Sequence, residues 1–148
     1  MTAIERSDLQ QAIEADLQAV VRQADGPGLA ELHSMLRYHL GWEGEGAGPR
    51  ATGKRVRPLL VLLACDAAGG DWQAALPAAS GVELLHNFSL IHDDIQDNSA
   101  TRRGRPTLWA RWGEAQAINA GDALFALAHL ALQRLDAEGY AQAAQLLP

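Results

Sequence analysis

The chain has 148 residues, a net charge of −6 and 48% apolar residues, while only 5% of its residues are aromatic. This length suffices for one domain with a real hydrophobic core. A core built from Leu, Ala, Val and Ile suits packed helices better than a sheet. The acidic balance argues against a protein that binds nucleic acid in general, because such a surface is basic.

The single cysteine and the distribution of apolar residues predict a cellular compartment. Cys65 lies in an apolar run and is expected to be a small buried side chain, and one cysteine excludes an internal disulfide. The first residues lack the apolar core of a signal peptide. No stretch approaches the roughly 18 apolar residues of a membrane-spanning helix. We therefore expect a soluble, cytoplasmic protein without a membrane span.

Apolar residues at helical spacing predict six helical segments separated by turns rich in glycine and proline. The segments cover approximately residues 3–24, 29–41, 57–70, 72–97, 106–138 and 140–147. The loop 41–53 carries five glycines and has little reason to be rigid by itself. The helix 106–138 is expected to break or bend near Gly113 and Gly121. Because neither β-alternation nor a hairpin dipeptide is found, the sequence predicts a single all-α domain over residues 1–148.

Three aspartates lie near the end of the helix expected over 72–97, namely Asp93, Asp94 and Asp97. Asp93 and Asp97 are four residues apart and share one helical face, about 6 Å apart along the axis, whereas Asp94 lies roughly 100° around. Mg²⁺ prefers such hard oxygen ligands and is bound by a few carboxylates together with substrate phosphates. The motif therefore predicts a magnesium site that acts on a phosphorylated substrate.

Two basic clusters accompany the aspartates. Arg102 and Arg103 follow a short polar turn, and because adjacent side chains diverge they could address two different phosphate groups. Lys54 and Arg57 are three residues apart at a helix N-terminus, where free backbone N–H groups already favour an anion. An isolated cluster of this kind is usually a solvated basic turn. Beside a carboxylate site in an acidic protein, a diphosphate pocket is the better interpretation.

Two further residues of the same helix are candidates for the site. His86 lies two turns before Asp93 on nearly the same face, so the two side chains project toward one volume. Phe88 is expected either to pack in the core or to form the floor of an apolar pocket below the metal site. The other histidines, the tryptophans and one arginine are expected to be surface, packing or solvated residues: His33, His39, His92, His129, Trp42, Trp72, Trp109, Trp112 and Arg105.

Together these motifs resemble the trans-isoprenyl diphosphate synthases, the short-chain polyprenyl synthetase family. The resemblance rests on four linked pieces in order: Gly53-Lys-Arg-x-Arg-Pro58, Glu83-Leu-Leu-His86, Ser89-Leu-Ile-His-Asp-Asp-x-x-Asp97 and Arg102-Arg-Gly-x-Pro-Thr107. Asn119-x-Gly-Asp122 follows at the family's usual place. One aspartate motif alone would be weak evidence, whereas four pieces with the right spacing are strong evidence.

The resemblance implies a bundle of long helices around a deep central cavity, usually in a homodimer, and it implies a role for each candidate residue. Asp93 and Asp97, assisted by Asp94, would hold Mg²⁺ on an allylic diphosphate, which Arg102 would also contact. The diphosphate of isopentenyl diphosphate would be bound by Lys54, Arg57, His86 and Arg103. Phe88 would limit chain growth, which favours a C15 to C20 product.

The sequence also departs from the family pattern, because family members are about twice as long and carry a second aspartate-rich helix. The chain is therefore expected to be the N-terminal half of the bundle, with an apolar face that something else covers. A fragment of a longer enzyme, a cleaved product with its other half and a naturally split subunit remain open. The expected partners are a second copy or a second half-chain.

Three functions are compatible with these motifs to different degrees. The first is a Mg²⁺-dependent prenyltransferase that condenses isopentenyl diphosphate with an allylic diphosphate, of the geranyl, farnesyl or geranylgeranyl diphosphate synthase type. The alternative is a non-catalytic partner subunit of a full-length synthase, which the absent second motif favours. Lys54, Arg57 and His86 argue against a terpene cyclase, because a cyclase has no second diphosphate substrate to hold.

Overall fold

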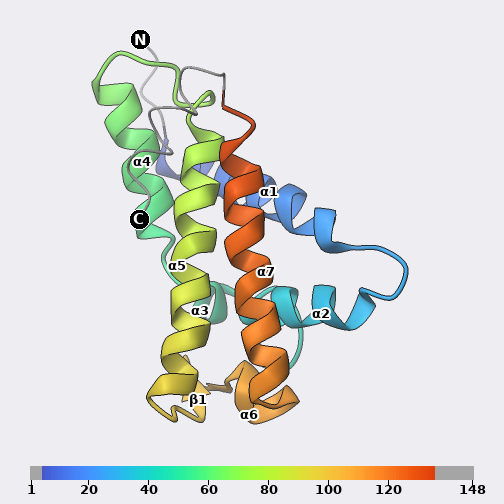
Figure 1. Ribbon diagram of the computed structural model, residues 1–148. Helices are drawn as coiled ribbons and strands as arrows, with labels where there is room; N and C mark the ends of the chain where they lie inside the picture. The colour runs from blue at the N-terminus through green and yellow to red at the C-terminus, as the bar shows by residue number, and fades with distance from the viewer. Residues whose placement is uncertain (1–4, 136–148) are drawn as a thin grey trace.

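A computed structural model describes residues 5–135 of the chain, and within this range seven α-helices form the fold (Figure 1). The elements in chain order are α1 (Arg6–Val21), η1 (Arg22–Ala24), α2 (Ala30–His39), α3 (Pro49–Thr52), α4 (Val56–Ala67), α5 (Leu76–Gln96), β1 (Thr101–Arg102), β2 (Arg105–Pro106), α6 (Leu108–Trp112) and α7 (Glu114–Leu132). The predicted all-α class is confirmed. The expected helix 140–147 lies outside the described residues.

Two long helices, α5 and α7, lie side by side and run in opposite directions through the molecule (Figure 1). Small residues allow their close approach. A Cβ atom on Gly81 would lie 2.9 Å from Cγ of Leu132, and one on Gly121 would collide with the ring of His92. The expected break at Gly113 is confirmed, whereas the expected bend at Gly121 is wrong, because α7 continues through it and uses the missing side chain for packing.

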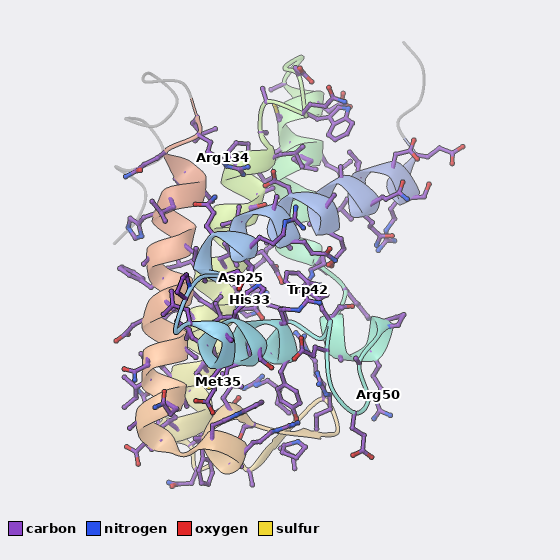
Figure 2. The ribbon with its side chains drawn as sticks, turned by 90° about the vertical axis from the view of Figure 1, so that its right-hand side faces the viewer. Asp25, His33, Met35, Trp42, Arg50 and Arg134 are labelled. Carbon is purple, nitrogen blue, oxygen red and sulfur yellow. The ribbon has the colours of Figure 1, made fainter. Side chains whose placement is uncertain are left out.

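The helices α1 and α2 cover one side of this pair (Figure 2). The inward face of α1 is fully buried through Leu9, Ile13 and Leu17, as its helical spacing predicts. Figure 2 shows Trp42 between α1 and α3, where its indole Nε1 donates a hydrogen bond of 2.8 Å to Glu14 Oε2. Apart from Met35, Tyr38 and Pro58, the buried apolar side chains of the described range are Leu, Ile, Val and Ala, which confirms the expected core.

A short hairpin that the sequence analysis did not anticipate follows α5. Thr101 pairs with Pro106 and Arg102 with Arg105 in antiparallel register. The turn between the strands consists of Arg103 and Gly104, with φ of 53° and 78°. Positive φ at both central residues is the geometry of a two-residue hairpin turn. This hairpin determines where the three arginines of the motif point.

Large apolar side chains remain exposed on two helices of the described range. On α4 these are Val56, Leu60 and Leu63, and on α7 they are Ile118, Phe125 and Leu130. Such stripes were expected of a half-bundle. Cys65 is only half-buried rather than buried, and its thiol lies 3.5 Å from the carbonyl oxygen of Asp71. No described helix has the length and hydropathy needed to cross a membrane.

Candidate functional site

The aspartate motif occupies the last turn of α5 and its C-cap. Asp93 and Asp97 are exposed, whereas the side chain of Asp94 is buried. This division follows from helical geometry, because residues four apart share a face and the intervening residue points elsewhere. Two carboxylates therefore face solvent together at one end of the bundle.

Asp94 is paired with the first arginine of the hairpin. Arg102 Nε lies 3.0 Å and 2.9 Å from the two carboxylate oxygens of Asp94, and Nη2 lies 2.8 Å from Oδ1. The hydrogen bond with Asp94 raises the pKa of Arg102, and the charges of Asp94, Asp93 and Asp97 add to this effect against the opposing effect of burial. The guanidinium is thus held in a fixed orientation beside the two exposed aspartates.

Arg103 points to a different part of the molecule. Its Nη1 donates a hydrogen bond of 2.6 Å to the carbonyl of Ala51, and its guanidinium lies against Gly53, where a Cβ atom would be 2.8 Å from Nη2. The two adjacent arginines therefore diverge, as the sequence predicts. Gly53 is required here both for this close approach and for its φ of 75°.

A positive electrostatic field surrounds the middle of α5. Burial lowers the pKa of His86, and the charges of Arg57, Arg103 and Arg102 lower it further, whereas Glu83 opposes them. The structure thus brings the predicted residues Arg57, His86 and Arg103 into one electrostatic neighbourhood. A neutral imidazole offers a hydrogen-bond donor without repelling the arginines.

Lys54 lies on the side of the basic segment that faces α1. It is exposed and lines an open hollow of about 510 Å³ beside α1, together with Gln10, Glu14 and Trp42. Asp94, Arg102 and Arg103 line a small cavity of about 20 Å³, whereas Lys54 does not, and neither do Arg57, His86, Asp93 and Asp97. Phe88 is half-buried, with its ring centroid 4.6 Å from His92 and 5.2 Å from Phe125. These ring contacts correspond to core packing, which is one of the two roles expected for Phe88.

A buried ion-pair network that sequence reasoning missed supports the basic segment. Arg55 is 5% exposed and donates to Glu14 Oε1 (2.6 Å), to Glu83 Oε1 (2.9 Å) and to the carbonyl of Leu40 (3.1 Å). Asn87 also donates to Glu83 Oε1 at 3.0 Å. A signal existed in the sequence, because Glu83 and Asn87 lie four apart on the core-facing side of an apolar helix, and a buried carboxylate needs a partner.

One expectation about a single residue is wrong, and a second residue has surroundings that the sequence did not reveal. Arg105 is not a solvated charge, because it is only 7% exposed and bonded to backbone carbonyls. His39, expected to be a surface or packing residue, is partly buried. It lines the small cavity with Arg102 and Arg103, and its Nε2 is inaccessible and has no hydrogen-bond partner. Burial lowers the pKa of His39 to about 3, helped by Arg103, Arg102 and Arg55 and opposed by Asn87.

A sequence model of polyprenyl synthetase matches residues 48–147, which is more than half of the chain. The chain belongs to the polyprenyl synthetase family. It is 50% identical over 107 residues to (2E,6E)-farnesyl diphosphate synthase of Mycobacterium tuberculosis, covering 71% of this chain and 30% of that enzyme. It is 47% identical over 116 residues to geranylgeranyl diphosphate synthase of the same organism, covering 77% of this chain and 33% of that enzyme.

Solved structures agree with this assignment. The polyprenyl synthetase from Streptomyces coelicolor superimposes with a TM-score of 0.81 at 36% identity, covering 94% of this chain and 40% of that one. The predicted isoprenoid-synthase type of helical bundle is therefore confirmed. The chain spans about a third of the length of the two mycobacterial relatives.

The carboxylates of the aspartate motif in this polyprenyl synthetase family member are oxygen ligands of the kind that Mg²⁺ requires. Within residues 5–135, no group of three or more His, Cys, Asp or Glu side chains is arranged to hold a metal ion. Asp93 and Asp97 are free at the surface, while both oxygens of Asp94 are bonded to Arg102. Mg²⁺ commonly takes one or two carboxylates and completes its octahedron with waters and substrate phosphates. The donor set therefore fits a magnesium ion that is shared with a diphosphate.

Proposed function

We propose that this chain supplies the diphosphate-binding part of a trans-isoprenyl diphosphate synthase, which condenses isopentenyl diphosphate with an allylic diphosphate. The observation that supports this most is the grouping of Asp93, Asp97 and Arg102 at one end of α5, with Arg57, His86 and Arg103 around its middle, in a member of the polyprenyl synthetase family. The relatives that are named farnesyl and geranylgeranyl diphosphate synthases support a C15 to C20 product.

Each residue has a role in this proposal. Asp93 and Asp97 would hold Mg²⁺, which neutralises charge on the allylic diphosphate as it departs. Arg102, oriented by Asp94, donates to the same diphosphate. Lys54, Arg57, His86 and Arg103 bind the diphosphate of isopentenyl diphosphate. Phe88 limits chain growth. We place this reaction in the cytoplasm, in a homo-oligomer or a complex with a second half-chain.

The test is Mg²⁺-dependent binding of inorganic pyrophosphate to the 148-residue chain, measured by calorimetry for Asp93→Ala and for Asp8→Ala. Asp8 is an exposed aspartate in the first turn of α1 and serves as the matched control. We expect Asp93→Ala to weaken binding by about tenfold or more, because it removes one of two carboxylates that compete with water for the ion. Equal effects of the two substitutions would remove the basis of the proposal.

The alternative is a non-catalytic partner subunit of a full-length synthase. Two observations favour it: the described residues contain no cluster of three metal-binding side chains, and apolar stripes are exposed on α4 and α7. Native mass spectrometry combined with an elongation assay using labelled isopentenyl diphosphate distinguishes the two functions. Elongation by this polypeptide alone eliminates the alternative. Activity only with a longer homologous chain, together with co-migration, supports it.

A further inference from the structure

Arg105 makes an unusual set of hydrogen bonds for an arginine in a diphosphate-binding motif. Its Nε donates to the carbonyl of Glu45 (2.8 Å), Nη1 to that of Tyr38 (2.8 Å) and Nη2 to that of Glu43. Its guanidinium also stacks on the ring of Tyr38, with Cζ 3.9 Å from the ring centroid. Within residues 5–135, no carboxylate lies within salt-bridge distance of it. The buried cation is therefore stabilised by three backbone dipoles and one aromatic face.

These contacts join two segments that are far apart in the sequence. Arg105 belongs to β2, and the three carbonyls belong to the end of α2 and the glycine-rich loop 41–48. The hydroxyl of Tyr38 donates back to the carbonyl of Pro106 at 2.9 Å. Arg103, at the turn of the same hairpin, donates to the carbonyl of Ala51. Hydrogen bonds therefore connect the hairpin, through β2 and through its turn, to the segment 38–51.

The glycine-rich loop needs such an anchor. Gly41, Gly44, Gly46 and Gly48 all have positive φ, and glycine loses more conformational freedom on folding than any other residue. A Cβ atom on Gly44 would lie 2.8 Å from the ring of Tyr38 and 3.2 Å from Nη2 of Arg105. The loop therefore packs tightly against this guanidinium. Arg105 adds three hydrogen bonds to those that the loop makes through the side chains of Trp42 and Glu43 and through its own backbone, between Gly48 N and Gly41 O (3.0 Å).

We propose that Arg105 is a positioning residue, which holds the loop 41–48 against the hairpin and thereby fixes the two basic segments of the site relative to each other. One segment is Gly53–Arg57, which directly follows the anchored loop and α3. The other is the Arg102–Arg103 pair, and Arg102 lies opposite Arg105 in the register of the hairpin. This inference rests on the proposed function, because it assigns both segments to diphosphate binding.

The test compares Arg105→Lys with Arg111→Lys in the 148-residue chain. Lysine keeps the charge but lacks the planar fork that reaches three carbonyls. Arg111 also lies over the ring of Tyr38, 4.7 Å from its centroid, but it is exposed and therefore controls for the stacking and for the loss of a guanidinium. Hydrogen–deuterium exchange of the amides of Ala47 and Gly48 reports the loop, and calorimetry with Mg²⁺ and inorganic pyrophosphate reports the site.

We expect Arg105→Lys to accelerate exchange of these two amides and to weaken pyrophosphate binding by about tenfold, since small displacements of binding groups are costly. Arg111→Lys should leave both unchanged. If Arg105→Lys does not fold, Tyr38→Phe, which removes only the hydroxyl bond to Pro106, should produce both effects to a smaller degree.

Two results overturn the inference alone: unchanged exchange in Arg105→Lys, or faster exchange with unchanged pyrophosphate affinity. A parent chain that binds no pyrophosphate overturns the proposed function first and removes the site that Arg105 would position. Exchange at Ala47 and Gly48 would then still show whether Arg105 anchors the loop.

Discussion

The seam between α5 and α7 and the polar centre around Arg55 differ in how their buried groups are satisfied. The seam contains glycine, alanine and leucine residues, whose packing is non-directional and follows the helical period. The polar centre, here Glu14, Arg55 and Glu83, depends on partners that are 28 and 41 residues apart in the sequence. Truncating a buried side chain therefore has different consequences in the two regions: it leaves a cavity in the seam, but an uncompensated charge in the polar centre.

The largest effects should come from single substitutions in these two regions, first of all from Glu83 in the polar centre. Glu83→Ala leaves the buried guanidinium of Arg55 with only part of its charge compensated, and we expect it to lower the free energy of unfolding by about 3 kcal/mol or more. Urea unfolding followed by circular dichroism measures this change. Where Glu83→Ala is too unstable to study, Glu83→Gln provides the milder change, because it removes the charge and keeps the size.

Two further variants test whether the loss of stability in Glu83→Ala comes from a cavity or from the uncompensated charge of Arg55. Leu84→Ala, at the next position of the same helix, should cost about 2–5 kcal/mol through a cavity. The double variant Arg55→Met with Glu83→Leu should recover much of the stability lost in Glu83→Ala, because replacing a whole buried ion pair by apolar groups is often neutral. If the double variant is less stable than Glu83→Ala, the network stabilises the fold by more than mutual charge compensation.

The same difference explains how much of the fold could be predicted. Helical periodicity located the main helices within a few residues, because apolar spacing reports burial directly. The hairpin was missed because Arg103 carries a positive φ in its turn, and arginine gives no local signal for that conformation. The bend expected at Gly121 was wrong, because the glycine serves the close approach of His92 rather than the end of a helix.

The candidate site could be predicted only in part, for a similar reason. The placement of Asp93 and Asp97 on one exposed face and the divergence of Arg102 from Arg103 follow from local geometry. The burial of Arg105 could not be read from its neighbours, since its acceptors are 60 or more residues away in the sequence. Buried polar groups are specified by their partners, and a single sequence does not show which partners meet.

An intermediate effect should appear in the pH dependence of stability through His39. Burial and the charges of Arg103, Arg102 and Arg55 lower the pKa of His39 to about 3, so the unfolded chain binds a proton at this histidine before the folded chain does. Its contribution is therefore fully present above about pH 6.5 and declines as the pH falls toward 3. Over this window, we expect the free energy of unfolding to fall by up to about 1.4 kcal/mol per pH unit because of this residue.

His39→Phe should remove that part of the slope, since phenylalanine fills a similar volume and takes up no proton. Urea unfolding at pH 7, 6 and 5 provides the comparison with the parent chain. His129→Phe is the matched control, because His129 lies near the surface on α7, where its Nδ1 is 2.9 Å from the carbonyl of Phe125. If His39→Phe retains the full slope of the parent chain, His39 does not carry this pH dependence.

The smallest effect should come from Arg134, near the end of α7 (Figure 2). Its ion pair with Asp16 is less buried than that of Arg55 and Glu83. Its Nη1 lies 2.9 Å from Asp16 Oδ1 and its Nη2 2.6 Å from Oδ2. Burial raises the pKa of Asp16, but hydrogen bonds from Arg134 and Ser80 outweigh it and lower the pKa overall. The stabilisation is therefore present above about pH 4 and is lost as the pH falls through the depressed pKa of Asp16.

Arg134→Ala should cost about 1 kcal/mol at pH 7 and clearly less at pH 3, measured by urea unfolding at both values. A cost of several kcal/mol at pH 7 would mean that this half-exposed pair behaves like the buried pair of Arg55 and Glu83, so that burial would no longer distinguish them.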